Sequence, residues 1–304
     1  MLVMFLSLLP CITGDGIASA QPTSAPARIV DFQPGVQIDW TERQVVVDAT
    51  VILRQGPLEL FACTPKIREH EAIIRIEARA QHVYQGMGLI GLEPGSPMRY
   101  DPATETIHAA TGEPVELLVR YRKSGREVTH PVEQWLRPAG KDVELPPLPW
   151  VFAGSALTPD DRFAADIEGT VVSVVDFPSA LIALAESHTD ANESLWLEPV
   201  TERIPPVNTS CELIIQSAPL RLTLTPTGRI RYAGKVLTGE ALTDLARSTV
   251  KATPGRRVVL ILEPGHPKSE AKRIMDTLQE IGVKLEVTQQ APSSQPASAP
   301  AIDR

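Results

Sequence analysis

The sequence has few cysteines, no excess of positive charge and no nucleotide-binding motif. Three cysteines among 304 residues are too few for a four-cysteine zinc site or for an iron–sulfur cluster. A formal net charge of −8 provides no basic surface for nucleic acid or for an anionic membrane. Neither a phosphate-binding loop nor a dinucleotide fingerprint occurs. We therefore expect no cofactor and no nucleic-acid partner.

A hydrophobic run of the about 20 residues needed to span a bilayer is also absent. The apolar stretch that ends at Ile12 has only about 11 residues, and Ala18-Ser19-Ala20 then has the small residues of a signal-peptidase site. We predict that residues 1–20 are a cleaved signal peptide. Cleavage would leave no transmembrane anchor and place the protein outside the cytoplasm, either periplasmic or secreted. The alternatives are a buried N-terminal segment and a lipoprotein modified at Cys11.

Two cysteines, Cys63 and Cys211, remain after such a cleavage. An oxidising compartment permits one disulfide between them. Cys63 follows the apolar run "LELFA", however, and buried cysteines often stay free. Both a Cys63–Cys211 disulfide and two separate thiols are therefore compatible with the sequence.

Segments rich in proline, serine and alanine divide the chain. Residues 21–30 contain "QPTSAPA" and are predicted to be a linker, and residues 289–304 are predicted to be a disordered tail of similar composition. The part between them is long enough for two domains with proper cores. We place these domains at residues 31–217 and 218–288.

The first domain is predicted to be rich in β-strands. Val36, Ile38 and Trp40 begin a hairpin that continues, after "TERQ", with "VVVDATVIL". A second hairpin turns at residues 123–125, and "ARAQHVYQGMGLIGL" predicts a short helix despite its glycines. The segment "FAADIEGTVVSVV" is predicted to add strands, and "PSALIAL" a helical turn.

Six blocks of this first domain resemble the YdjY domain, which occurs in secreted bacterial proteins of unknown function. In order along residues 35–208 they are "GPLELFAC", "EHEAI", "GLEPGSPMRYDP", "WVFAGS", "DFPSALIAL" and "LEPVTERIPP". The resemblance implies a family and a compartment. It implies no reaction, because the family has no settled activity.

The second domain alternates between the periods of strands and helices. Leu220, Leu222 and Leu224 alternate with polar residues, and "VVLIL" is a continuous apolar run typical of a central strand. One helix is predicted to begin after the N-cap Thr238, and a second helix is predicted to end at Gly282. The resulting order, ββαβαβ, predicts two helices on one face of a four-stranded sheet. The whole chain is thus predicted to be α+β, with a β-rich domain followed by a small two-layer domain.

This second domain resembles the periplasmic module of ExbD and TolR proteins. The resemblance rests on "GRIRYAGKVLTGEALTDL", "RRVVLILEPGHP" and "AKRIMDTLQEIGVKLEV". Those proteins couple to an ion-driven motor through an acidic residue inside a transmembrane helix. Because no apolar run of about 20 residues precedes the module here, we do not expect the motor function. The resemblance implies the fold and a sheet edge or groove for peptide-like partners.

Glu69, His70 and Glu71 form the densest group of titratable residues. A histidine between carboxylates is a candidate metal ligand or general base, so His70 and Glu71 are candidate catalytic residues. On an extended strand entrance, Glu69 and Glu71 would lie on one side and His70 on the other. The alternative is a solvated strand entrance at which His70 pairs locally.

Three further segments contain candidate residues. Ser155 ends "WVFAGS" and is a candidate nucleophile, although the second glycine of a nucleophile elbow is missing. Asp176 and Ser179 belong to a turn that is predicted to open a helix. Together with Trp150 these two residues are predicted to line a pocket; simple capping of the turn is the alternative.

The combined features favour an exported, non-enzymatic binding or structural protein of the cell envelope. Its expected partner is an envelope protein or a cell-wall component, bound at a sheet edge or in a groove. The alternative is a metal-dependent hydrolase or metal-binding protein with its site near Glu69, His70 and Glu71. That alternative requires His70 to converge with His82, Asp176 or another ligand in a concave site.

Overall fold

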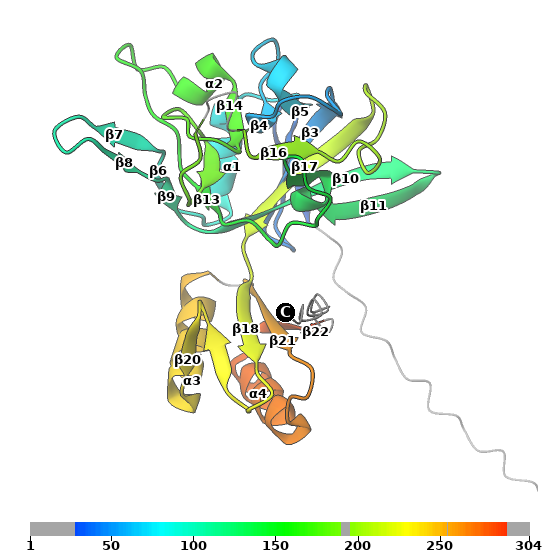
Figure 1. The fold of residues 1–304 in the computed structure, drawn as a ribbon, viewed down its shortest axis with the longest axis vertical. Coiled ribbons are helices and arrows are strands. Elements are labelled where there is room, and N and C mark those ends of the chain that lie inside the picture. The colour runs from blue at the N-terminus through cyan, green and yellow to red at the C-terminus, as the bar shows by residue number, and fades with distance from the viewer. Residues whose placement is uncertain (1–27, 190–194, 254, 291–304) are drawn as a thin grey trace, which may run out of the picture.

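A computed structural model describes residues 28–189, 195–253 and 255–290 of the chain. These residues form two units, each around its own hydrophobic core (Figure 1). The larger core draws on residues from Val36 to Ile215, and the smaller on residues from Leu220 to Val283. The larger unit is rich in strands and the smaller one is a sheet covered by helices, so the predicted α+β class is confirmed.

The larger unit contains seventeen of the strands in the described residues. Its first strands are β1 (Ile29–Gln33), β2 (Val36–Asp39), β3 (Gln44–Val51), β4 (Leu60–Cys63), β5 (Ala72–Ile76), β6 (Pro94–Ser96), β7 (Arg99–Asp101), β8 (Thr106–His108) and β9 (Thr111–Gly112). The others are β10 (Val115–Lys123), β11 (Arg126–Pro131), β12 (Leu136–Pro138), β13 (Trp150–Phe152), β14 (Thr170–Ser173), β15 (Ile182–Leu184), β16 (Leu197–Pro199) and β17 (Ser210–Ser217). The helices are α1 (Ala80–Leu89) and α2 (Ala164–Glu168), with short 3-10 helices η1 (Glu69–Glu71) and η2 (Val132–Trp135).

One large sheet, of eleven strands in the described part of the chain, organises this unit. Its order is β11-β10-β17-β3-β5-β4-β14-β15-β13, with β2 pairing to both β3 and β1. At the β13 end, Val151 also bridges Pro114, the residue directly before β10. The sheet therefore curls back on itself and encloses the core, while the β10–β11 hairpin extends outward (Figure 1).

Helix α1 covers the sheet at β2 and β3, and a glycine makes this packing possible. A Cβ atom on Gly86 would lie only 3.1 Å from Val45 Cγ1 and 3.3 Å from Ile38 Cδ1. The residue that lowers helix propensity thus allows the helix backbone to approach the sheet closely. Val83 and Met87 on the same helix are buried.

Two sequence predictions in this unit are wrong. Part of "FAADIEGTVVSVV" is the helix α2, not a strand. The Ala165 N–H in its first turn donates to Ser155 Oγ, and Gly169 ends the helix with φ +80°. The segment "PSALIAL" contains strand β15 instead of a helical turn. β15 lies between β13 and β14 and is buried on both faces, so it shows neither strand alternation nor a helical stripe.

The smaller unit contains β18 (Leu220–Leu224), β19 (Ile230–Tyr232), β20 (Lys235–Leu237), α3 (Gly239–Ala252), β21 (Arg257–Leu262), α4 (Lys268–Ile281) and β22 (Lys284–Gln289). The sheet order is β20-β19-β18-β21-β22, so the short strand β20 is an addition to the predicted four. The Ala241 N–H donates to Thr238 Oγ1, which confirms the predicted N-cap, and Gly282 ends α4 at φ +82°. No helix in the described ranges is long and apolar enough to cross a membrane.

The two units are joined by Ala218 and Pro219 alone, between β17 and β18. Their contact is polar: Glu116 of β10 forms ion pairs with Arg221 of β18 and Arg257 of β21. Lys284 of β22 pairs with Glu42 of the larger unit. Neither core contains residues of the other unit, so these charged contacts position the smaller unit on the larger.

Candidate ligand-binding pocket

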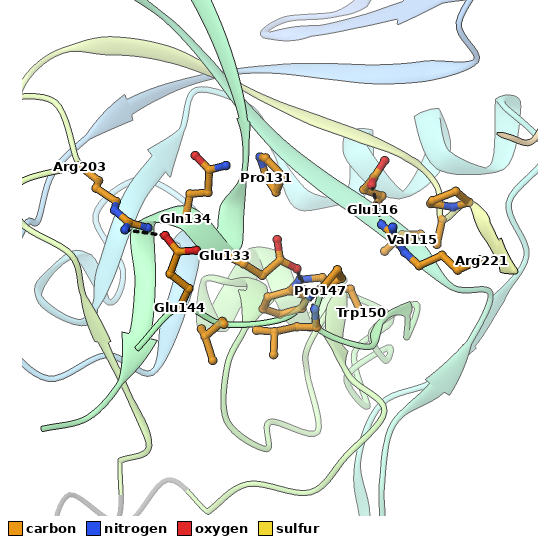
Figure 2. A pocket seen from close by; sticks show the side chains of 14 residues that line it. Val115, Glu116, Pro131, Glu133, Gln134, Glu144, Pro147, Trp150, Arg203 and Arg221 are labelled. Atoms are coloured by element: carbon orange, nitrogen blue, oxygen red, sulfur yellow. Dashed lines mark hydrogen bonds and ion pairs between the residues drawn. The ribbon is translucent and has the colours of Figure 1, made fainter. Parts of the chain in front are cut away.

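A cavity of about 260 Å³ lies where the two units meet. We call it the junction pocket, and Figure 2 shows its lining. The lining consists of Val115, Glu116, Pro131, Glu133, Gln134, Glu144, Leu145, Pro147, Leu148, Trp150, Arg203, Ala218, Pro219 and Arg221. The larger unit, the connector and β18 of the smaller unit all contribute to it.

The 3-10 helix η2 places Glu133 in this pocket. Val132 and Trp135, at the two ends of η2, are fully buried. The Trp135 ring packs against Tyr121 and Phe61, with ring centroids 5.7 and 6.1 Å away. Because one turn of helix lies between these anchors, Glu133 has no freedom to leave the pocket without disturbing the core.

The two carboxyl oxygens of Glu133 have different roles. Oε1 accepts hydrogen bonds from the Leu148 backbone N–H at 2.9 Å and from the Trp150 indole N–H at 3.0 Å. It thereby holds the segment that leads into β13 against η2. No other described residue donates a hydrogen bond to Oε2, which faces the pocket (Figure 2). Glu133 therefore presents one free acceptor to a ligand.

The surroundings of Glu133 favour its neutral form. Burial raises the pKa of Glu133 above its usual value of 4.5, and the negative charge of Glu116 adds to this increase. Hydrogen bonds from the Leu148 N–H, from the backbone N–H of Glu133 itself and from Trp150 oppose it. A carboxyl group whose ionised form is poorly solvated gains most from a ligand that brings a positive charge or a donor.

The two arginines that line the pocket are engaged elsewhere. Arg203 Nη2 donates to Glu144 Oε1 at 2.8 Å on one side of the pocket, and Arg221 Nη2 to Glu116 Oε1 at 3.3 Å on the other (Figure 2). Glu116 is also bound by Arg257 from outside the lining. Each lining guanidinium group thus pairs with a carboxylate other than Glu133.

The YdjY domain family model matches residues 36–216. The chain belongs to the YdjY domain family. The match extends from the start of β2 to Gln216 near the end of β17, so it includes Glu133, Trp150 and Glu116 but not Arg221. No match was found among curated proteins.

The YdjY domain holds Glu69, His70 and Glu71 in the 3-10 helix η1, not at an extended strand entrance. The expected alternation of sides therefore does not occur. His70 Nε2 lies 3.0 Å from Glu71 Oε1, and the other oxygen of Glu71 accepts from Arg68 at 3.2 Å. Glu69 accepts from the Lys66 N–H at 2.7 Å. The His70 side chain is 78% exposed, so this group is brought together on the surface and not in a concave site.

Metal binding was the alternative for these residues. Among the described residues, no group of three or more His, Cys, Asp or Glu side chains is arranged to hold a metal ion. Each carboxylate near His70 is engaged by a cation or a backbone N–H. The structure offers no positive observation for a metal site at this position.

Ser155 and Ser179 lie close together in the YdjY domain, in a network of hydrogen bonds. Ser155 Oγ donates to the Ser179 carbonyl at 2.8 Å and accepts from Ala165. Ser179 Oγ accepts from Thr170 Oγ1 at 2.9 Å and donates to Glu168. No imidazole contacts Ser155 in the described part of the chain, so its hydroxyl joins β13, α2 and the turn before β15 without an adjacent base.

The predicted grouping of Trp150, Asp176 and Ser179 around one pocket is not what the structure shows. Trp150 lines the junction pocket, whereas Ser179 belongs to the network with Thr170. Asp176 accepts a hydrogen bond from Ser187, and its N–H donates to the His188 carbonyl. Asp176 and Ser179 lie between β14 and β15, whereas Trp150 begins β13, and of the three only Trp150 lies at the junction.

The disulfide between Cys63 and Cys211 is not formed, and both thiols are free and buried. Cys63 lies on β4 and Cys211 on β17, with β5 and β3 between them in the sheet. Three strand spacings amount to about 14 Å, about twice the Cα separation that a disulfide tolerates. Burial raises the pKa of each thiol to about 12.

Three pocket residues, Glu133, Glu116 and Arg221, are not among those predicted from the sequence. Glu133 stands between Val132 and Trp135 in "HPVEQWL", and an acidic residue within an apolar segment is a sign of a carboxyl group held at a buried site. Glu116 and Arg221 alternate with apolar residues as ordinary surface positions do. Nothing in the linear pattern indicates that they meet across the junction.

Proposed function

We propose that this protein is an exported, non-enzymatic binding protein of the cell envelope, and that the junction pocket is its binding site. The observation that carries the proposal is the free oxygen of Glu133, in a cavity to which both units contribute. A carboxyl group held rigidly from one side and open on the other is suited to recognition.

A binding role suits the lining better than catalysis does. The lining contains no serine, cysteine, histidine or lysine that would serve as a nucleophile. The negative charge of Glu116 acts on Glu133, but the Glu116 carboxylate is itself bound by Arg221, Arg257 and Gln216. It is therefore poorly placed to act as the second carboxylate of an acid–base pair.

The C-terminal module and the location of the protein are part of the same proposal. We infer that residues 218–288 are an ExbD/TolR-like module that works apart from a motor; two helices on one side of a small sheet support this. Export is supported by the pattern of residues 1–20, which lie outside the described residues. Both inferences place the partner in the envelope, as a protein or as a cell-wall component.

A sheet edge provides a second contact surface. β22 lies at one end of the module's sheet, and no described strand pairs with its outer side. An extended segment of an envelope protein can add there through backbone hydrogen bonds. Successive residues of a strand direct their N–H groups to opposite sides. The Gln290 N–H donates to the Leu262 carbonyl of β21, so the Val287 N–H, three residues earlier, is expected to point to the outer side of β22.

Site-specific photocrosslinking in cells tests the proposed function. A photoreactive amino acid at Gln134, on the rim of the pocket, is compared with one at Lys123, at the exposed tip of the β10–β11 hairpin. We expect a discrete crosslinked product in the envelope fraction from position 134 only. Equal products from both positions, or none from position 134, would contradict a binding role for this pocket.

A further inference from the structure

We propose that the junction pocket binds a primary amine on an unbranched aliphatic stem, as in a lysine side chain, with the ammonium group on Glu133 Oε2. This inference rests on the proposed function and specifies the ligand class of the same site. No cofactor or metal ion is required. The ligand is held by one charged hydrogen bond and by apolar contact.

The distribution of charge around the pocket favours a cation. Three carboxylates and two guanidinium groups line it, and both guanidinium groups are paired with Glu144 or Glu116. Arg257 lies between Glu116 and Glu286 outside the lining. Among the residues that the structure describes, Glu133 is therefore the acidic group of the lining without a cationic partner, and an anionic ligand would meet three carboxylates.

The free acceptor also distinguishes an ammonium from a guanidinium group. Two parallel N–H donors of a guanidinium group require both oxygens of a carboxylate. In Glu133 one oxygen is already used by Leu148 and Trp150. An ammonium group is a compact charge and can donate to the single oxygen that remains.

The walls of the pocket suit an aliphatic stem. Pro131, Leu145, Pro147, Leu148 and Pro219 form most of the apolar lining. Methylene groups beside these side chains leave water while the charged end stays on the carboxyl group. A cavity of about 260 Å³ admits one such chain and not a folded peptide.

The charged groups that face Glu133 determine the dependence of binding on pH. They are Glu116 from β10, Glu144 from the segment before β13, Arg203 from the turn after β16, and Arg221 from β18. The arginines stay charged at all relevant pH values. Binding of an amine is therefore expected to weaken as the pH falls and Glu133 takes up a proton.

Nuclear magnetic resonance of the tryptophan indole groups tests the inference in the full chain. The Trp150 N–H donates to Glu133, whereas the Trp196 N–H donates to the Val174 carbonyl and acts as an internal control. The ¹⁵N-labelled protein is titrated with butylammonium, with Nα-acetyl-lysine amide and with the neutral analogue butanol. Trp150→Phe assigns the resonance.

We expect a saturable shift of the Trp150 resonance with the amines, no shift with butanol and no shift of Trp196. Glu133→Gln, which keeps an acceptor for Trp150, should weaken amine binding about 10- to 100-fold. Glu127→Gln, on the exposed part of β11, is the matched control and should bind like the wild type.

Each other outcome has a defined meaning. A shift with both amines supports a lysine side chain of a polypeptide as the ligand, and a shift with butylammonium alone supports a free alkylamine. Equal shifts with butanol, or an unchanged affinity in Glu133→Gln, overturn the inference. If no amine binds while position 134 still crosslinks, the amine inference fails and the proposed function stands.

Discussion

Glu133 combines a structural role with a proposed binding role, because its two oxygens face different ways. Oε1 fixes Leu148 and Trp150, and Oε2 remains open to the pocket. In a glutamine at this position, the amide oxygen can accept the hydrogen bonds from Leu148 and Trp150, but the amide group lacks the negative charge that Oε2 presents to the pocket. The Glu133→Gln protein should therefore fold normally, and its comparison with the wild type isolates the effect of the charge.

The stability of Glu133→Gln should differ from the wild type in a pH-dependent way. The pKa of Glu133 is raised in the folded protein, so between its unfolded and folded values the folded state binds more protons. The wild type therefore loses stability relative to the variant as the pH rises above about 4.5. Urea unfolding of both proteins across this range measures the difference. If the wild type instead lost stability relative to the variant as the pH fell, the raised pKa of Glu133 would be contradicted.

Cys63 and Cys211 should both be unreactive in the folded protein. Each thiol is buried, with its pKa raised to about 12, and the thiolate is the reactive form. We expect alkylation by iodoacetamide only after unfolding, measured by mass spectrometry of the two peptides. Alkylation of either residue in the native protein, or a peptide linking the two, would contradict the burial and separation of these thiols in the sheet.

Single residues were the least predictable level of the site. The sequence predicted Trp150 as a pocket residue, although together with Asp176 and Ser179, which do not line the junction pocket. It did not identify Glu133, since the hydrogen bonds that single out this carboxyl group come from Leu148 and Trp150, about fifteen positions along the chain. Such contacts depend on the fold and leave no local pattern.

At the level of elements, the hairpins and the C-terminal helices followed their sequence patterns closely. The turn at Ser124 and Gly125 and the N-cap Thr238 are where the sequence places them. The errors concern two short elements: α2, which packs against α1 and β14, and β15, which lies in the interior of the sheet. Elements of three to five residues have too few positions for a period to appear, so tertiary packing decides their structure.

The contact between β10 and the C-terminal module depends on Glu116. Glu116→Ala removes the partner of Arg221 and Arg257, and we expect the docking of the module to weaken by about 1–3 kcal/mol. Hydrogen–deuterium exchange should then rise in β21 and around the connector. Glu286→Ala is the control: Glu286 pairs with Arg257 inside the module, and its loss should leave the junction protected. Equal effects of the two variants would contradict the role of Glu116.

The molecule as a whole has two cores, and they should respond separately to mutation. Leu278→Ala removes a fully buried side chain of α4 and should destabilise the C-terminal module by about 2–5 kcal/mol. All four tryptophans precede residue 218, so tryptophan fluorescence reports on the YdjY domain alone, whereas circular dichroism reports on both units. We expect an earlier circular dichroism transition and an unchanged fluorescence transition. Parallel shifts of both signals would show that the two units unfold as one.

The central claim is that Glu133 is the ligand-binding group of a pocket to which both units contribute. Titration calorimetry of the full chain with butylammonium, at about pH 7.5 and at about pH 5, tests it most directly. We predict binding at the higher pH, weaker binding at the lower pH, and a large loss of affinity for Glu133→Gln at the higher one. Binding that is independent of pH and equal in the variant would contradict the claim.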